Sequence, residues 1–512
     1  MAAKLQGMFL FFGILLAVSC VNEEEIPTEY AAKPTVNVPN GCEFPYFGGT
    51  VTLGSATAQA SIYYTLDGSD PVQYGSLVTG PVRITQNVVL KAVAKKAKLL
   101  DSDVLEVSYT LFSSGLTEYA RSMKIGWNLG NTFDGHNGMM PRETQWQGVV
   151  TTQELMDRVA QLGFGAVRIP VTWGRKLGNA SELGLRPSQM ALTVEQIEAL
   201  VIDAAWLDRV QEVVDYVLEA GMKAMLNIHH DGADSRYWLS VRGVDLTGTN
   251  KDRVDAIFRT LWTQIAERFK NYGEDLIFEG FNELHDGNWG YTNPGANHAG
   301  VIVTTTAQDL INQYARVNEL NQIFVNTVRA TGGNNAERYL VVSGLVTRPS
   351  LLRHLEMPAD SAEDKLIVNF HYYDPYDFSG SAAQSVWGSR AHSSGWANEA
   401  YVRNTFNDVR NRFANNNIPV IIGEYGAVRQ NSTAGKAHRL YYVEYVTKHA
   451  VDCGFIPFWW DNGSRPDQTG GGEQFGLFNR DTLEFSNDAE DIVKALMRAV
   501  NEDYLLSDIV AP

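Results

Sequence analysis

From residue 116 to residue 505, short apolar runs alternate with longer segments that have helical spacing. The runs contain few polar residues, as expected of parallel strands that are buried on both faces. The segments between them repeat apolar residues every third or fourth position, and TTQELMDRVAQLG and WLDRVQEVVDYVLEAG end in Gly, a common helix terminator. The runs are MKIGWNLGN, GAVRIPVTW, MKAMLNIHHD, LIFEGFNEL, RYLVVSGL, LIVNFHYYD, IPVIIGEYG and FIPFWWDNG.

Eight strands with helices between them predict a (β/α)8 TIM barrel, a fold of the α/β class. A doubly wound parallel sheet is the alternative, but no glycine-rich phosphate loop follows the first strand. The helix expected after the fifth strand is the least well marked, in the stretch LLRHLEMPADSAED. We therefore expect residues 116–505 to form one barrel domain.

Residues 41–112 have a different pattern. GTVTLGS, ASIYYTLDG, PVRIT and VVLKAVAKK alternate or cluster β-branched and aromatic residues, with Gly, Pro, Asp and Asn between them. This pattern predicts a small Ig-like β-sandwich ahead of the barrel. IYYTLDGSDP and the downstream VVLKAVA resemble the chitobiase C-terminal-type module found beside bacterial sugar hydrolases. Tyr63, Tyr64 and Tyr74 could stack on glycans there, but we expect them to be core and turn residues.

The N-terminus has the pattern of an export signal. Within residues 1–19, Lys4 precedes the apolar run GMFLFFGILLAVS, which is too short to span a bilayer comfortably. LLAVSC resembles a bacterial lipobox, which implies cleavage before Cys20 and lipidation of that residue. The following VNEEE resembles the tag that sends lipoproteins to the cell surface in some Gram-negative bacteria, and residues 20–40, with three Pro, have the composition of a tether. We expect export and a lipid anchor at the outer membrane, or secretion if the signal is an ordinary one.

Composition narrows the class of ligand. The formal net charge of −17 disfavours nucleic acid as a partner, because nucleic-acid binding needs a basic surface. The 22 Tyr, 22 Phe and 11 Trp residues supply flat apolar faces that suit sugar rings as well as they suit a core. The three Cys residues have no spacing typical of zinc or a disulfide framework. We expect a monomer that binds a neutral ligand, has no metal or cofactor, and meets the membrane only through its lipid.

Polar side chains stand at the ends of most predicted barrel strands. Active sites of these barrels lie at the C-terminal ends of the strands. A single His or Glu there is usually structural, but polar groups at so many strand ends together indicate a site. The candidates are Arg168, His229, His230, Asn282, Glu283, His371, Tyr373, Glu424 and Trp460.

Two of these candidates, Glu283 and Glu424, suggest a reaction. Cleavage of a glycosidic bond needs one carboxyl group that stays protonated and a second that is ionised. The barrel region resembles glycoside hydrolase family 5 in GWNLGNTFD, ETQWQG, VRIPVTW, NIHHD, FEGFNEL, NFHYYDPYDF, PVIIGEYGA and FWWDNG. The resemblance covers roughly residues 116–500. It is greatest to subfamily 4, which holds endoglucanases, xyloglucanases and lichenases.

The resemblance implies a role for each candidate. Glu283 would be the acid/base and Glu424 the nucleophile of a retaining endo-β-1,4-glucanase that acts on a β-glucan polysaccharide or oligosaccharide. Asn282 would bind the substrate 2-hydroxyl, Arg168 and Tyr373 would hold Glu424 ionised, and Trp460 would form the stacking floor. His229 and His371 would bind sugar hydroxyls or the carboxylates, with His230 and Asn128 in supporting positions. Strand alternation predicts that Tyr372 points outward and that Trp459 lies in the core.

Several alternatives stay open at this point. The HHD sequence at 229–231 with His371 could form a metal site, although adjacent residues of a strand should point to opposite faces. A degenerate barrel that only binds glycan is a second alternative, and xyloglucan or mixed-linkage glucan could replace cellulose as substrate. Gln147 interrupts the usual Trp-Gly pair of the subfamily in ETQWQG. About half of the remaining tryptophans near the loops should be stacking platforms: Trp127, Trp146, Trp173, Trp289, Trp387 and Trp396.

Overall fold

The structure, a computed structural model, describes residues 27–512 apart from 179–180, 236, 293–295, 299–300, 304–305, 392–396 and 465–472. The predicted signal, Cys20 and Trp396 therefore lie outside the described residues. The chain divides into two compact units, one with residues 27–44 and 48–111 and the other with residues 45–47 and 112–512. None of the described helices is long and apolar enough to cross a membrane.

The first unit is the predicted β module. Five strands form its main sheet in the order β2 (Glu43–Phe44), β9 (Leu105–Leu111), β8 (Val88–Lys95), β5 (Ser61–Thr65) and β6 (Ser76–Leu77). Two further pairs are β3 (Gly49–Val51) with β7 (Val82–Ile84), and β1 (Thr35–Val36) with β4 (Leu53–Gly54). The short helix α1 (Pro71–Tyr74) follows β5. Because β1 pairs within this unit, the predicted tether is shorter than residues 20–40.

The tyrosines of the module are only partly core residues. Tyr63 and Tyr64 are half-buried on β5, and Lys95 lies over the Tyr63 ring. Tyr74 ends α1 and is 69% exposed, so it is a turn residue. The apolar centre is formed instead by aliphatic residues such as Val51, Ile84 and Leu90.

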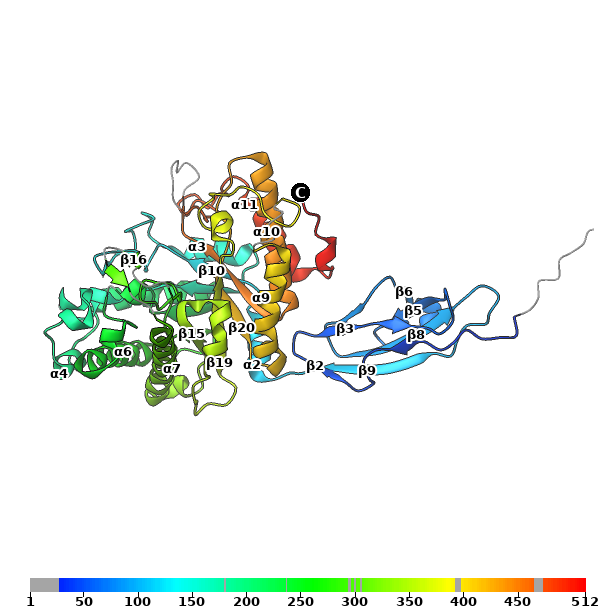
Figure 1. Cartoon of the computed structure of the whole chain (residues 1–512), viewed down its shortest axis with the longest axis horizontal. Coiled ribbons are helices and arrows are strands. Elements are labelled where there is room, and N and C mark those ends of the chain that lie inside the picture. The colour runs from blue at the N-terminus through cyan, green and yellow to red at the C-terminus, as the bar shows by residue number, and fades with distance from the viewer. Residues whose placement is uncertain are drawn as a thin grey trace, which may run out of the picture. The chain divides into compact units, whose positions relative to one another are not determined.

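The second unit is a closed eight-stranded parallel barrel, which confirms the predicted fold (Figure 1). Each predicted run contains one strand, because its β-branched and aromatic residues fill both the lumen and the space beneath the helices. The strands are, in barrel order, β10 (Gly126–Leu129), β13 (Ala166–Ile169), β14 (Lys223–Asn227), β15 (Leu276–Glu279), β18 (Leu340–Ser343), β19 (Leu366–Tyr372), β20 (Val420–Tyr425) and β21 (Phe455–Asp461).

Helices surround these strands (Figure 1). Thr152 accepts a hydrogen bond from the Leu155 amide and begins α3, and Asp203 caps α5 in the same way. Gly163 and Gly221 follow these two helices at φ 99° and 78°, which glycine adopts without strain. The helices are α2 (Gly115–Ser122), α3 (Gln153–Gln161), α4 (Val194–Glu198), α5 (Ala204–Glu219), α6 (Gly248–Phe269), α7 (Ala307–Ala330), α8 (Tyr376–Ser379), α9 (Glu399–Arg412), α10 (Thr433–Asp452) and α11 (Ala489–Asn501).

The weakly marked connection after the fifth strand contains no α-helix. Between β18 and β19, where every residue is described, the chain forms only the 3-10 helices Leu345–Thr347 and Pro349–His354. Short strand pairs also occur in other loops, namely β11 (His136–Asn137) with β12 (Met140–Pro141) and β16 (Ala296–His298) with β17 (Val301–Val303).

The lumen is layered. Met225, Ile277, Val341, Ile367 and Ile421 fill one level, together with Leu116 and Tyr119 of α2 and the neighbouring apolar residues. Residues two positions further along a strand point to the same side, so the next level toward the C-terminal ends holds Glu279, Ser343 and Asn369. The polar residues therefore stand on an apolar base.

Candidate active site

Glu283 and Glu424 meet at the C-terminal end of the barrel. Glu424 lies on β20, and Glu283 follows β15 by four residues. Nδ1 of His371 lies 2.6 Å from Oε1 of Glu283 and 3.7 Å from Oε2 of Glu424. One oxygen of each carboxylate and a ring nitrogen of His371 lie within 4.8 Å of one another. A register shift between β19 and β20 places His371 beside Glu424.

The surroundings of Glu424 favour its ionised form in part. Burial raises the pKa of Glu424, whereas the positive charge of Arg168 lowers it. Nη1 of Arg168 donates to Oε1 at 2.7 Å, and the Tyr373 hydroxyl donates to Oε2 at 3.3 Å. Burial and the charge of Glu424 raise the pKa of Tyr373, so its phenol keeps the proton that it donates.

Glu283 has the surroundings of an acid. Burial raises its pKa to about 7, against the lowering effect of Arg168 and a hydrogen bond from Thr347. The side chain of Thr347 lies 3.3 Å from Oε1. Burial lowers the pKa of His371 to about 4, so this ring is neutral where Glu283 titrates. The two carboxyl groups therefore differ in their partners, since Glu424 accepts from a guanidinium and Glu283 lies beside a neutral ring and a hydroxyl.

Arg168 is held by a third carboxylate, Glu279, that the sequence analysis missed. Nε and Nη2 of Arg168 donate to the two oxygens of Glu279 at 2.6 and 3.0 Å. Both side chains are completely buried. The strand alternation that puts Ile277 in the lumen also puts Glu279 there. The two-residue repeat along Leu276–Glu279 was therefore the signal that could have identified Glu279.

The remaining donors of Arg168 orient two asparagines. Nη1 donates to Asn128 Oδ1 at 3.1 Å and Nη2 donates to Asn282 Oδ1 at 2.8 Å. Asn282 lines the cavity, and its NH2 group is free of Arg168 and can serve as a donor to a ligand. Asn128 is completely buried and its NH2 group donates to the Gly423 carbonyl, so Asn128 supports the site without reaching substrate.

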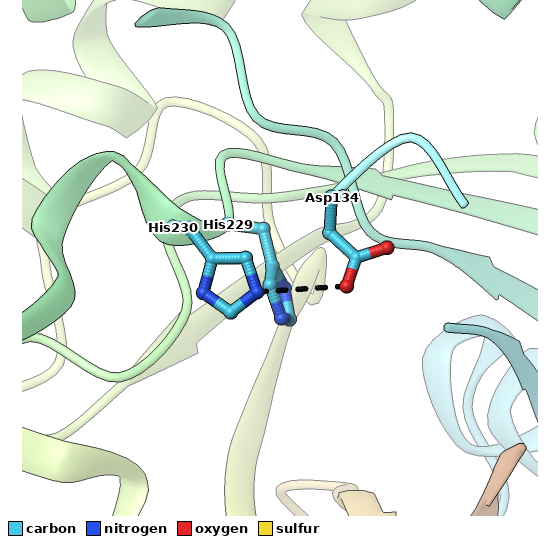
Figure 2. A group of neighbouring side chains, drawn as sticks. All are labelled: Asp134, His229 and His230. Carbon is cyan, nitrogen blue, oxygen red and sulfur yellow. Dashed lines mark ion pairs between the residues drawn. The ribbon is translucent and has the colours of Figure 1, made fainter. Parts of the chain in front are cut away.

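His229 and His230 lie side by side, contrary to the opposite faces that we predicted (Figure 2). Their ring centroids are 4.5 Å apart, because β14 ends at Asn227 and strand alternation no longer applies. Nε2 of His230 lies 3.5 Å from Oδ2 of Asp134. Whether this cluster can bind a metal therefore depends on which ring nitrogens carry a hydrogen.

The hydrogen bonds of His229 argue against a metal at this cluster. Asn227 Oδ1 accepts from the Val171 amide at 3.1 Å, which turns the Asn227 NH2 group toward Nδ1 of His229 at 3.2 Å. Nδ1 therefore accepts, and Nε2 of the neutral ring carries the hydrogen. A protonated nitrogen cannot ligate a metal. Asp231, another member of the alternative metal set, accepts instead from the Trp173 and Gly174 amides.

Trp460 forms one wall of the cavity and Trp459 does not. Trp460 is 7% exposed and lies parallel to the His229 ring, with centroids 5.9 Å apart. Trp459 is completely buried, and its Nε1 donates to the Phe475 carbonyl. Tyr372 also points outward as predicted, and its ring packs against Phe406 of α9.

The other tryptophans divide between platforms and core. Trp127, Trp173 and Trp387 are buried, and each therefore belongs to the core. Trp146 is 44% exposed beside His230, and Trp289 is 40% exposed. Only these two of the five described candidates can stack on a ligand.

Gln147 has a structural explanation. It is buried, its amide nitrogen donates to the Glu143 and Val149 carbonyls, and its oxygen accepts from the Val149 amide. The residue therefore closes the loop from within and leaves the neighbouring Trp146 exposed.

The cavity above the carboxylates has a volume of about 730 Å³. Glu283, Glu424 and Trp460 form its inner part, and Trp289 and Tyr291 also line it. The guanidinium of Arg348 lies 4.0 Å from the centre of the Tyr291 ring. Aromatic faces beside a carboxylate pair suit a sugar chain, because sugar rings present apolar faces and polar edges.

Comparison with known proteins identifies the family. The family described as cellulase (glycosyl hydrolase family 5) matches residues 129–465. The chain belongs to glycoside hydrolase family 5. Residues 43–106 match the chitobiase/β-hexosaminidase C-terminal domain, which agrees with the expected β module. This member of family 5 is a glycoside hydrolase of the cellulase type.

Relatives of this hydrolase include enzymes with several named substrates. The cellulase/esterase CelE of Acetivibrio thermocellus is 34% identical over 80% of this chain, which spans 44% of that longer protein. A xyloglucan-specific endo-β-1,4-glucanase of Bacteroides ovatus is 33% identical over 74% of this chain and 69% of its own length. The structure of a GH5-4 broad-specificity endoglucanase from Bacteroides salanitronis is 38% identical, with a TM-score of 0.66, over 76% of this chain and 96% of that one.

We expect Glu279→Gln to lower kcat at least tenfold and the free energy of unfolding by about 3 kcal/mol, because it removes the carboxylate that fixes Arg168. Asp255→Asn is a matched control, since Asp255 pairs with the buried Arg316 of α7, away from the cavity. This control should lose similar stability and keep its kcat. Denaturant unfolding and steady-state kinetics measure both quantities; equal loss of kcat in the two variants would contradict a specific role of Glu279.

Proposed function

We propose that this enzyme hydrolyses internal β-1,4-glucosidic bonds of β-glucan chains by retaining double displacement. The observation that supports this proposal is the pair of adjacent carboxyl groups with unlike partners. Glu424 contacts Arg168 and a phenol, whereas Glu283 contacts a neutral imidazole and a hydroxyl. Retaining enzymes hold two such carboxyl groups about 5 to 5.5 Å apart.

In the first step, Glu424 attacks the anomeric carbon while Glu283 gives its proton to the departing glycosidic oxygen. The bond from the anomeric carbon to that oxygen breaks, and an ester bond to Glu424 forms. The NH2 group of Asn282, whose Oδ1 accepts from Arg168, donates to the oxygen of the substrate 2-hydroxyl and holds the sugar in place while positive charge develops on its ring.

In the second step, Glu283 acts as a base. It takes a proton from water, whose oxygen attacks the anomeric carbon and releases Glu424. The two inversions give net retention. The neutral His371 stays hydrogen-bonded to Glu283 in both steps, so the carboxyl group keeps its orientation while its proton leaves and returns.

Xyloglucan and mixed-linkage β-glucan are the substrates that we propose as alternatives to cellulose. The xyloglucan-specific relative and the broad-specificity structure support this range. We assign contact with the sugar at the cleaved bond to the inner residues and preference among polymers to the exposed aromatic residues Trp146, Trp289 and Tyr291.

The roles of the two glutamates can be separated by azide rescue. Glu283→Ala with azide should give a β-glycosyl azide, because azide attacks the intermediate from the face that water uses. Glu424→Ala with azide should give the α-azide, because azide replaces the nucleophile. Proton NMR of the products distinguishes them, and the exchanged result would mean that the roles are reversed.

The pH dependence should follow the raised pKa of Glu283, about 7. The acid works only when protonated, so kcat/KM for cellohexaose should fall roughly tenfold per pH unit above that value. A dinitrophenyl cellobioside needs no proton on its leaving group and should show no such fall. Loss of activity for both substrates above the same pH would assign the ionisation to another group.

We also propose that the protein is exported and lipid-anchored through Cys20, as its lipobox-like LLAVSC suggests. In a Gram-negative host, the full chain should incorporate radioactive palmitate and fractionate with the outer membrane. Cys20→Ala should incorporate none and appear in a soluble fraction. Labelling that persists in this variant would contradict the assignment.

A further inference from the structure

The turn after β18 has an uncommon backbone beside the acid. Val346 has φ 59° and ψ 12°, and Thr347 has φ 50°. β-Branched residues rarely adopt this left-handed region, and two in succession are costly unless the surroundings impose them. Both residues are buried, Thr347 completely. Strain of this kind often accompanies a functional constraint.

Hydrogen bonds tie this turn to the segment that carries Glu283. The Val346 amide donates to the carbonyl of Leu284, the residue after Glu283, at 3.1 Å. The Thr347 amide donates to the Gly344 carbonyl at 3.1 Å and closes the turn. As a result, Oγ1 of Thr347 lies 3.3 Å from Oε1 of Glu283.

The second partner of Oε1 is a defined tautomer of His371. The Gly423 amide donates to Asn369 Oδ1 at 2.9 Å, so the Asn369 NH2 group, which also donates to Glu279 at 2.8 Å and Ser343 at 3.3 Å, faces Nε2 of His371 at 3.4 Å. Nε2 is then the acceptor, and Nδ1 carries the hydrogen that it donates to Oε1 of Glu283 at 2.6 Å. A ring N–H thus donates to one oxygen of the acid, and the Thr347 hydroxyl lies within hydrogen-bond distance of the same oxygen.

We infer that Thr347 is a positioning residue for the general acid: its hydroxyl, with His371, occupies Oε1 of Glu283 and leaves the transferable proton on Oε2. Among the described residues, no hydrogen bond reaches Oε2. The inference rests on the proposed function. Thr347 follows β18, the fifth strand of the barrel, so that strand end also supplies a residue to the site. The sequence analysis predicted no polar site residue there.

The hydroxyl can also respond to the reaction. Its single hydrogen has two acceptors in reach, Oε1 of Glu283 and the Val346 carbonyl at 2.6 Å. Once Glu283 has given up its proton, the carboxylate is the stronger acceptor. The hydrogen bond from Thr347 therefore strengthens as proton transfer proceeds, which favours the transition state over the bound substrate.

Other charged or titratable groups face Glu283 and remain in every Thr347 variant. They come from several different parts of the barrel, so a change in the pH profile of such a variant reports the hydroxyl itself. These groups are Arg168 on β13, His230 after β14, Arg348 after β18, His371 on β19, Tyr373 after β19, Tyr376 on α8 and Glu424 on β20.

The test compares Thr347→Val, which keeps the shape, with Thr347→Ser, which keeps the hydroxyl. The readout is kcat/KM for phenyl cellobioside, whose leaving group needs a proton, and for dinitrophenyl cellobioside, whose leaving group does not. We expect kcat/KM of the Val variant to fall about tenfold for the phenyl substrate and to stay unchanged for the dinitrophenyl substrate. In the pH profile of kcat/KM for the phenyl substrate, the alkaline fall should move upward by roughly half a pH unit. The Ser variant should match the wild type on both substrates.

Three outcomes would overturn the inference: equal losses on both substrates, no loss on either, or a Ser variant as impaired as the Val variant. Thr347→Ala replaces the Val variant if that protein does not fold, as judged by thermal unfolding. Glu283→Ala keeps the two proposals distinguishable, because it should lose activity on the phenyl substrate even where Thr347 has no role. Wild-type protein without activity on either glycoside would contradict the proposed function instead.

Discussion

The active site depends on one buried guanidinium that serves two carboxylates. Burial acts to lower the pKa of Arg168, but Glu279 and Glu424 raise it further, so the charge persists inside the barrel. Removing one partner of such a set leaves a buried charge without a counter-charge, which is strongly destabilising. Each of the three residues therefore depends on the other two. Glu279 fixes the position of Arg168, and Arg168 in turn fixes Glu424, Asn128 and Asn282.

The position of this ion pair follows from strand alternation. Lumen positions repeat every two residues, so each strand offers an apolar group and then a polar group at the next level. Ile277 and Glu279 illustrate this order on β15. Catalytic groups thus extend from strands that are anchored below by close packing, and their geometry does not rely on loops alone.

Much of the site could be predicted because strand ends of a barrel converge. Glu283, Glu424 and Trp460 were found in that way, and all three line one cavity. Glu279 was missed because it stands inside an apolar run, and Thr347 because its left-handed turn leaves no periodic signal in the sequence. The relation of His229 to His230 was wrong because alternation ends with the strand, at Asn227.

The apolar level at the base of the lumen also limits how molecules reach the site. Leu116, Tyr119 and the strand residues above them are buried and close the lumen from below, so the open route to Glu283 is the cavity at the C-terminal ends of the strands. Water for the second step must then occupy the space vacated by the departing sugar. A sugar hydroxyl reaches the anomeric carbon by the same route, so in the second step of the proposed mechanism it competes with water for one position.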